Sequence, residues 1–498
     1  MQEKAQAEHG AMMASTGIES LDDIMGGGYR TNRLYLIEGV PGSGKTTLAL
    51  QFLLEGARRN EPTLYITLSE SSEELVSVAE SHGWSLSGIT LRELVPSEAA
   101  LRPDDHYTMF HPSEVELGET TRTILEEVDR INPKRVVFDS LSELRLIAGS
   151  PLRYRRQILA LKHFFAGRDC TVLMLDDMTS SERDLQVQSI AHGVLLLEQM
   201  NPDYGAERRR LRVVKYRGLS FRGGYHDYAI RRGGIVVFPR LVATEHRKVS
   251  GMQRLPSRIG ELDTLLGGGI ERGTSTLITG APGTGKSSVV AQFVYAAAER
   301  GESAAMFIFD ESINTLVSRA AALSIDLQKH IDTGRVTIQQ VDPAELSPGE
   351  LIQAIRKSVE DRGVSMVVID SLNGYLNAMP GERFLIIQLH ELLTFLGQSD
   401  VATLLISAHQ GLIGSNMTSP VDVSYLADAV ILMRYFEAEG EVRQAISVVK
   451  KRGGAHERSI REFRMLDGRI MVGEPLRNFR GILTGVPIYQ EAAPRVET

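Results

Sequence analysis

At residues 39–46 the chain reads GVPGSGKT, which fits the pattern G-x-x-x-x-G-K-[S/T] of a phosphate-binding loop, or P-loop. The apolar run 34–37 precedes it and a helical run, 47–54, follows it. A glycine-rich stretch alone could be a tight turn, but this order of strand, loop and helix points backbone N–H groups at bound phosphate. Lys45 can then reach the β- and γ-phosphates, and the Thr46 hydroxyl can bind Mg²⁺. The stretch therefore predicts a nucleotide-binding domain.

The same loop returns at residues 280–287 as GAPGTGKS, and the stretch GIESLDDIMGGG at 17–28 returns at 258–269 as RIGELDTLLGGG. The steps from Gly26 to Gly267, Lys45 to Lys286 and Glu70 to Glu311 are all 241 positions. A chain of 498 residues also exceeds what one hydrophobic core usually organises. We therefore expect two tandem copies of one domain, at 1–245 and 246–498.

Short apolar runs alternate with helical runs in each copy, which predicts an α/β fold with a mainly parallel sheet covered on both faces. The first copy should contain strands 63–68, 135–139, 171–175 and 194–197, helices 73–80 and 120–130, a surface loop over 95–117, and antiparallel hairpins built from 213–218, 225–230 and 234–238. The second should contain strands 306–309, 366–370, 404–407, 430–433 and 445–449. The polar tail after Ile488 is expected to be disordered.

Composition is that of an ordinary soluble globular protein, with 42% hydrophobic and 24% charged residues. No apolar run reaches the length of a transmembrane helix, and the polar start of the chain lacks the apolar core of a signal peptide. A single cysteine, Cys170, excludes an intrachain disulfide framework and a cysteine-built zinc site. We therefore expect a cytoplasmic protein. Its net charge of −8 does not favour nucleic acid as a partner.

Acidic residues end the predicted strands that follow each P-loop. Asp139 and Asp370 can hold Mg²⁺ beside the P-loop hydroxyl, although a lone aspartate at a strand end is usually only solvated. Glu70 in the first copy, and Asp310 with Glu311 in the second, can orient a water or deprotonate a hydroxyl. The alternative is a polar turn, because the neighbouring serines (Ser69, Ser71 and Ser312) are potential helix caps.

Two late hairpins carry the sequences KYRG at 215–218 and KKRG at 450–453. Residues 215–217 and 450–452 form two triplets, and on a strand the first and third residues of a triplet point to the same face. They could act as cationic fingers that neutralise charge during phosphoryl transfer, or they could form a solvated basic edge that prevents aggregation. Their distance in sequence from each P-loop suggests that they serve a neighbouring subunit.

From about Ser15 to Pro487 these features together resemble the KaiC family of circadian clock ATPases, which have two RecA-like domains in tandem. The resemblance implies a homohexameric double ring with ATP and Mg²⁺ bound between subunits. In that family the first ring is a slow ATPase that recruits KaiB, and the second ring autophosphorylates on adjacent hydroxyl residues and can dephosphorylate. The resemblance therefore implies a KaiB-like partner.

Carried over position by position, the resemblance assigns three sets of residues. The nucleotide-binding set is Gly42, Ser43, Gly44, Lys45, Thr46, Thr47, Ser81, Lys215, Tyr216 and Arg217 in the first copy, and Gly283, Thr284, Gly285, Lys286, Ser287, Ser288, Lys450, Lys451 and Arg452 in the second. The magnesium set is Thr46, Asp139, Ser287, Asp310 and Asp370. The catalytic set is Glu70, Asp310 and Glu311, so the first copy has one acid because Ser69 replaces its partner.

The phosphoacceptor segment of the family corresponds to residues 421–428. Ser424 falls on the serine acceptor, although a serine before a strand is ordinarily a turn residue. Tyr425 replaces the threonine acceptor, and its phenol oxygen lies farther from the backbone. The C-terminal region shows no amphipathic helix of the kind that binds KaiA in cyanobacterial members, so we expect no dependence on KaiA.

Three functions fit the sequence. The first is a KaiC-like ATPase and autokinase in signalling or timing, which the intact second-copy P-loop, acids, fingers and Ser424 favour. The second is a nucleotide-switched ring without kinase activity. The third is a DNA-dependent motor resembling RecA or RadA, which the acidic net charge and the absence of a separate DNA-binding module disfavour.

Overall fold

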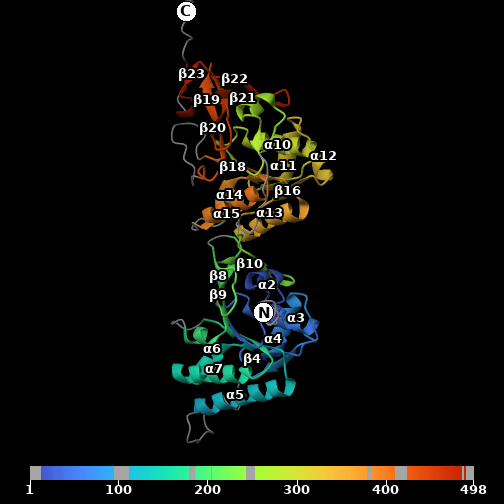
Figure 1. Cartoon of the computed structure of the whole chain (residues 1–498), viewed down its shortest axis with the longest axis vertical. Coiled ribbons are helices and arrows are strands. Elements are labelled where there is room, and N and C mark those ends of the chain that lie inside the picture. The colour runs from blue at the N-terminus through green and yellow to red at the C-terminus, as the bar shows by residue number, and fades with distance from the viewer. Residues whose placement is uncertain are drawn as a thin grey trace, which may run out of the picture. The chain divides into compact units, whose positions relative to one another are not determined.

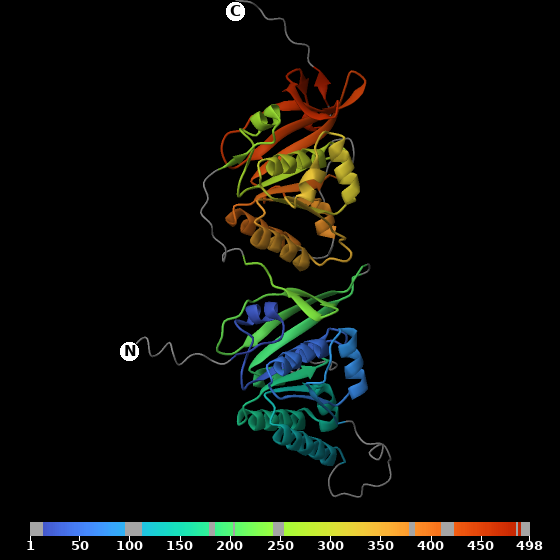
Figure 2. The ribbon, with the colours of Figure 1, turned by 90° about the vertical axis from the view of Figure 1, so that its right-hand side faces the viewer.

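The computed structural model describes residues 13–94, 112–178, 185–202, 205–242, 253–377, 384–409, 423–484 and 487–489, and of these it describes the backbone alone at 112–120, 185–186, 377 and 484. Its internal contacts divide the chain into two compact units, residues 1–240 and 241–498. Each unit is built around a nine-stranded sheet with helices packed on it (Figure 1, Figure 2). The expected α/β class is confirmed in both.

The sheet of the first domain has the strand order β11-β10-β9-β8-β3-β7-β6-β4-β5. The six strands β8, β3, β7, β6, β4 and β5 are parallel, and β9, β10 and β11 continue the sheet beyond β8 as antiparallel hairpins. The strands are β3 (Leu34–Gly39), β4 (Thr63–Thr67), β5 (Thr90–Glu93), β6 (Arg135–Asp139), β7 (Thr171–Asp176), β8 (Gly193–Met200), β9 (Arg208–Tyr216), β10 (His226–Arg231) and β11 (Gly234–Phe238), beside the small pair β1 (Met13–Ala14) and β2 (Tyr29–Arg30).

Helices cover both faces of this sheet because its strands are apolar on both sides. In β3, Tyr35 and Ile37 join the core beneath one helical layer, whereas Leu34 and Leu36 join the core beneath the other. The first layer contains α2 (Glu19–Met25), α3 (Lys45–Arg58) and α4 (Ser72–Ser81); the second contains α5 (Pro112–Ile131), α6 (Leu141–Ala148), α7 (Pro151–Ala166) and α8 (Leu185–Ile190).

The second domain repeats this plan with the strand order β16-β15-β17-β18-β14-β19-β20-β21-β22. Its strands are β14 (Ser275–Gly280), β15 (Ala304–Ile308), β16 (Val336–Gln340), β17 (Met366–Asp370), β18 (Ala402–Ala408), β19 (Ala429–Ala438), β20 (Glu441–Lys451), β21 (Ile460–Leu466) and β22 (Arg469–Pro475), with the pairs β12 (Arg254–Leu255) and β13 (Ile270–Glu271), and β23 (Phe479–Arg480) and β24 (Ile488–Tyr489). One face carries α9 (Gly260–Leu265), α10 (Lys286–Glu299), α11 (Ile313–Ala321) and α12 (Leu327–Asp332); the other carries α13 (Pro348–Arg362), α14 (Leu372–Asn377) and α15 (Phe384–Gln398).

Two predictions need correction. The expected loop over 95–117 is wrong at its end, because α5 begins at Pro112, and proline is well suited to the first turn of a helix; residues 95–111 lie outside the described part. Tyr489, expected in a disordered tail, pairs with Phe479 in β23–β24, whereas residues 490–498 are not described. Among the described helices, none is long and apolar enough to cross a membrane.

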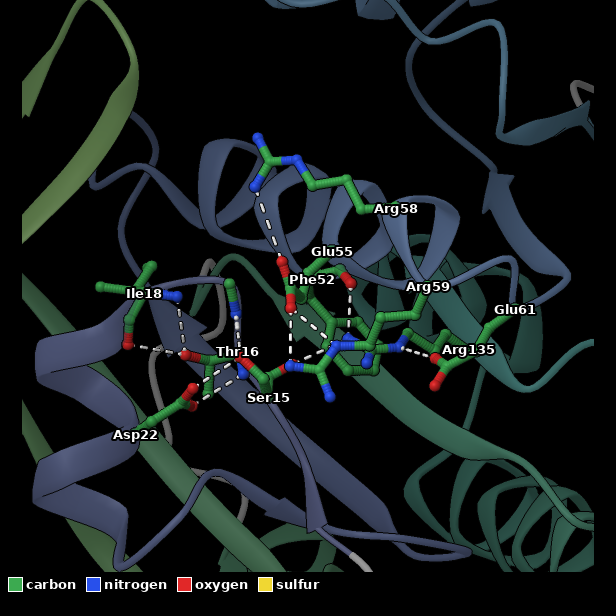
Figure 3. Close-up of polar contacts among 11 residues, drawn as sticks. Ser15, Thr16, Ile18, Asp22, Phe52, Glu55, Arg58, Arg59, Glu61 and Arg135 are labelled. Atoms are coloured by element: carbon green, nitrogen blue, oxygen red, sulfur yellow. Dashed lines mark hydrogen bonds and ion pairs between the residues drawn. The ribbon is translucent and has the colours of Figure 1, made fainter.

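A buried guanidinium holds the first domain together at the start of β6 (Figure 3). Arg135 is 1% exposed, and its Nε lies 2.5 Å from Glu61 Oε2. Its NH1 donates to the carbonyl oxygens of Ser15 (2.7 Å) and Phe52 (2.9 Å), and its guanidinium stacks over the Phe52 ring. The guanidinium stem fits there because residue 56 of α3 is glycine; a side chain at this position would place its Cβ 2.6 Å from Arg135 Cδ. One side chain thus ties the N-terminal segment and α3 to the sheet.

The second domain has no arginine at the equivalent position, the start of β17. The first residue of β17 is Met366, and α10 has Ala297 where α3 has Gly56. The carboxylate of Glu302, which corresponds to Glu61, pairs instead with Arg272 at 3.1 Å. Met366 and Ala297 are both fully buried in one apolar core of the second domain.

Replacement of Arg135 by the methionine of the second domain should destabilise the first domain by about 3 kcal/mol, because two backbone carbonyls and Glu61 lose a buried partner. Arg135→Met combined with Gly56→Ala should recover part of the loss by refilling the space. Chemical denaturation followed by the fluorescence of Trp84, the chain's only tryptophan, measures the effect in this domain. Arg122→Met, at an exposed arginine of α5, is the control; equal midpoints for the two single variants would contradict the prediction.

Candidate functional site

Parallel strands bring the candidate residues to one edge of each sheet. In the first domain the P-loop follows β3, Asp177 follows β7, Asp139 ends β6, and Glu70 follows β4. These four strands are neighbours in the sheet, and their carboxyl ends lie together. Ligands of open α/β sheets bind at this edge. The second domain places its P-loop, Asp370, Asp310 and Glu311 in the same way around β14, β17 and β15.

Both P-loops have the backbone conformation that phosphate binding requires. Gly44 and Gly285 stand directly before α3 and α10 with φ of 90° and 96°, a left-handed conformation that favours glycine. Lys45 Nζ donates to the carbonyl oxygens of Gly39 (2.8 Å) and Val40 (3.1 Å), and Lys286 Nζ donates to the equivalent pair, at 3.0 and 2.7 Å. Each lysine is thus folded over the mouth of its own loop, where the phosphates would lie.

The residues expected to bind magnesium lie together in each domain. Ser287 lies beside Asp370, whereas in the first domain the Tyr65 hydroxyl donates to Asp139 Oδ2 (2.6 Å) and lies beside Thr46. Burial raises the pKa of Asp139 to about 6 and that of Asp370 to about 6, and Asp370 Oδ2 has no partner among the described residues. A cation would relieve this burial cost. One carboxylate and one hydroxyl, completed by phosphates and water, fit Mg²⁺.

The candidate catalytic acids differ between the domains. Burial, together with the neighbouring carboxylate of Asp139, raises the pKa of Glu70 to about 7, and Glu70 Oε2 is buried without a partner among the described residues. Glu311 instead accepts two hydrogen bonds from Arg319 of α11, at 2.7 and 2.8 Å. The residue of α4 that corresponds to Arg319 is Val78.

The residues next to these acids also differ between the domains. Asp310 accepts a hydrogen bond from Ser371 Oγ (2.6 Å), whereas the first domain has serines at both equivalent positions, and Ser140 Oγ has no partner among the described residues. The predicted capping role is confirmed for Ser71 and Ser312, which cap α4 and α11. Ser81 ends α4, is exposed, and donates to the Val78 carbonyl of its own helix.

The outer residues of each hairpin triplet contact the segment that enters the preceding strand. Lys215 Nζ donates to three carbonyl oxygens at the end of α8, and Arg217 donates to that of Ser189 at 2.8 Å. Lys450 Nζ donates to the carbonyl oxygens of Ser424 (2.9 Å) and Ala427, and Arg452 donates to that of Tyr425. The two cations of each triplet therefore lie on one side, as predicted.

The middle residues point the other way. The Tyr216 hydroxyl donates to the Gly28 carbonyl (2.8 Å), and the Lys451 ammonium, on a side chain that is 4% exposed, pairs with Glu271 (3.2 Å) and donates to the Leu266 carbonyl. Both therefore support the glycine turn of their own domain. The sequence predicted a nucleotide contact for these two residues and did not predict this structural role.

The cations and Ser424 lie at the sheet edge opposite their own P-loop. Lys215 pairs with Val194 near the start of β8, whose first residue is in register with Tyr35 at the start of β3, whereas the P-loop follows the end of β3. These edges are about 17 Å apart at the rise of a parallel strand. In the second domain Ser424 precedes β19, which starts beside Thr276 of β14. Ser424 is half-buried and Tyr425 is 55% exposed.

Several site residues were missed from the sequence. Asp177 Oδ1 lies 2.8 Å from Lys45 Nζ, and His82 Nε2 lies 3.4 Å from Thr47 Oγ1. Asp177 could have been found by the rule that singled out Asp139, because it follows an apolar strand. Tyr65 and Arg319 carry no comparable signal, since a strand tyrosine and a helix arginine are ordinary there.

The two glutamates should affect the stability of the nucleotide-free protein in opposite directions. Glu70→Gln should raise the melting temperature at pH 8, where the native carboxylate is ionised against its raised pKa. Because the folded-state pKa of about 7 lies above the ordinary value of 4.5, the native carboxyl takes up a proton as the pH falls, so the gain should shrink between pH 7 and 4.5. Glu311→Gln should lower the melting temperature modestly, because it loses the partly exposed Arg319 pair. Calorimetry in EDTA measures both; shifts of the same sign at pH 8 would contradict this.

Comparison with known proteins agrees with this geometry. The family model described as "ATPase: KaiC" matches residues 14–242 and 255–477. The circadian clock protein KaiC3 of Synechocystis sp. is 28% identical, over 97% of this chain and 96% of its own length. The circadian clock oscillator proteins KaiC of Picosynechococcus sp. and Thermosynechococcus vestitus are 28% and 29% identical, over 96% and 95% of this chain and 93% and 91% of their own lengths. With both domains matched, the chain belongs to the KaiC family of ATPases.

Proposed function

We propose that this protein is a homohexameric double ring that hydrolyses ATP in its first domain and autophosphorylates on Ser424 in its second. Phosphoryl transfer and charge neutralisation take place between neighbouring subunits. The ring serves signalling or timing, in keeping with the clock proteins among its relatives, and a KaiB-like protein is its proposed partner.

One observation carries the proposal. Each domain has its P-loop and acidic residues at one edge of the sheet, and the cations of its hairpin triplet at the opposite edge. The residues of this opposite edge are too far from their own P-loop to act there: Lys215 and Arg217 in the first domain, and Lys450, Arg452 and Ser424 in the second. A head-to-tail contact brings one edge against the other, and contacts of this kind close into rings. The number of six subunits follows the family resemblance.

We assign the residues to phosphate binding, magnesium binding and charge neutralisation. Lys45 and Lys286 bind phosphates with the glycines of their loops, and Ser43, Thr47, Ser81, Thr284 and Ser288 complete the nucleotide contacts. Thr46 with Asp139, and Ser287 with Asp370 and Asp310, would hold Mg²⁺, which when bound neutralises phosphate charge. Lys215, Arg217, Lys450 and Arg452 contribute positive charge from the neighbouring subunit.

The acids have separate tasks. Glu70 has an unpartnered carboxylate oxygen and a pKa of about 7, which suits a group that orients a water and accepts its proton near neutral pH. Glu311 takes the proton of the neighbouring Ser424 hydroxyl, and it must leave Arg319 to do so.

The second candidate, a nucleotide-switched ring without kinase activity, is favoured by one observation. Both oxygens of Glu311 are bound by Arg319 within the same domain, which opposes its action as a base.

Phosphosite mapping after incubation with Mg-ATP separates the two candidates. We expect phosphate on Ser424 in the wild type and in Glu70→Gln, the matched control in the other domain, and at least tenfold less in Glu311→Gln, because only that variant lacks the base. An unmodified Ser424 beside steady ATP hydrolysis would support the switch instead.

Mixed rings test transfer between subunits. Lys286→Ala subunits should carry no phosphate on Ser424 when incubated alone, because they lack the donor site. Mixed with Ser424→Ala subunits, which retain that site, they should become phosphorylated. Tagged subunits of different mass allow each to be measured. If the wild type is phosphorylated but the mixture is not, transfer does not cross the subunit boundary as proposed.

A further inference from the structure

The two P-loop lysines differ in one contact. An ammonium group has three N–H donors, and Lys45 uses them for the carbonyl oxygens of Gly39 and Val40 and for Asp177 Oδ1, at 2.8, 3.1 and 2.8 Å. Lys286 makes the two equivalent carbonyl bonds, but among the described residues it has no ion pair with a carboxylate. Both lysines are similarly buried, at 6% and 7% exposure. Within the described part of the chain, the first P-loop lysine therefore pairs with a carboxylate and the second does not.

Asp177 and Ala408 occupy the same position in the two domains. Each follows or ends the strand beside the P-loop strand, β7 or β18. Each backbone N–H also donates to the third residue after the magnesium-site aspartate: Asp177 to Ser142 Oγ (3.3 Å), and Ala408 to Asn373 Oδ1 (2.9 Å). The two positions thus differ in their side chain but not in their anchoring.

The position of Asp177 is fixed by its neighbour. Asp176 is 4% exposed and is held by Ser142 Oγ (3.1 Å) and by Arg145 (2.8 Å). It also accepts a hydrogen bond from the N–H of Met178 (3.2 Å), which closes the turn around Asp177. The carboxylate of Asp177 is directed at Lys45 by this buried anchor, so the ion pair is a built feature of the first domain.

We propose that Asp177 is an internal competitor for phosphate in the first domain, so that this site binds nucleotide more weakly than it would without the Asp177 carboxylate. A phosphate oxygen and the carboxylate require the same N–H donor of Lys45. When nucleotide enters, Asp177 gives up its cation and remains as an uncompensated negative charge beside the phosphates. The nucleotide class is a nucleoside di- or triphosphate, and the inference rests on the proposed binding of nucleotide through both lysines.

Removal of this competition should change the nucleotide affinity enough to be measured. Asp177→Asn keeps the shape of the side chain and removes the charge, so we expect its first-domain site to bind nucleotide about tenfold more tightly, corresponding to about 1.4 kcal/mol. Ala408→Asp should install the competitor in the second domain and weaken binding there by a similar factor.

The experiment titrates the full-length chain with Mg-mant-ADP, a fluorescent ADP that is not hydrolysed, and follows its fluorescence. Asp177→Asn is measured in a Lys286→Ala background, so that the first site dominates. Ala408→Asp is measured in a Lys45→Ala background, so that the second site dominates. Asp177→Ala, which reproduces the residue of the second domain, replaces Asp177→Asn if the latter does not fold by circular dichroism.

Tighter binding in the Asp177 variant and weaker binding in the Ala408 variant would support the inference. A dissociation constant within twofold of the parent in the Asp177 variant, or a weaker one, would overturn it while leaving the proposed function intact. Failure of the wild-type chain to bind Mg-mant-ADP at all would instead refute the proposed function.

Discussion

The direction of the parallel strands is the constraint on which the function of this protein depends. A parallel sheet collects the carboxyl ends of its strands at one edge, so the P-loop, the proposed magnesium-binding aspartate and the proposed catalytic acid meet there. The hairpins that extend the sheet return their cations to the other edge. No loop movement of ordinary size brings the two edges of one rigid sheet together. Assembly into a ring is therefore part of the chemistry that we propose.

Duplication has kept this layout while changing the charges within it. In the first domain Asp177 pairs with the P-loop lysine, and Glu70 Oε2 has no partner among the described residues. In the described part of the second domain the P-loop lysine pairs with no carboxylate, and Glu311 is paired with Arg319. The charge that is paired is thus the P-loop cation in one copy and the proposed catalytic anion in the other. Two sites with one fold can in this way differ in nucleotide affinity and in readiness to accept a proton.

The sequence predicted the parts of the site that local patterns specify. The P-loops, the aspartates at the ends of β6 and β17 and the alternation of Lys215 with Arg217 are all local, because a loop motif, a strand end and a strand period each span a few residues. Arg319 could not be predicted as the partner of Glu311, since its rotamer on α11 decides whether it reaches back two turns. The start of α5 was also missed, because its sequence is polar and resembles a loop.

The middle residue of each hairpin triplet shows how the two edges remain coordinated within one domain. Strand alternation turns Tyr216 and Lys451 toward the glycine turn of their own domain, while the cations on either side of them point the other way. Although one is a neutral phenol and the other a cation, both bind the glycine turn that follows the first helix of their domain, and Lys451 needs Glu271 because its charge is buried. A shift of either hairpin would therefore break these contacts to the glycine turn. In the ring that we propose, the alignment of the triplet cations with the next P-loop then depends on the contact between subunits.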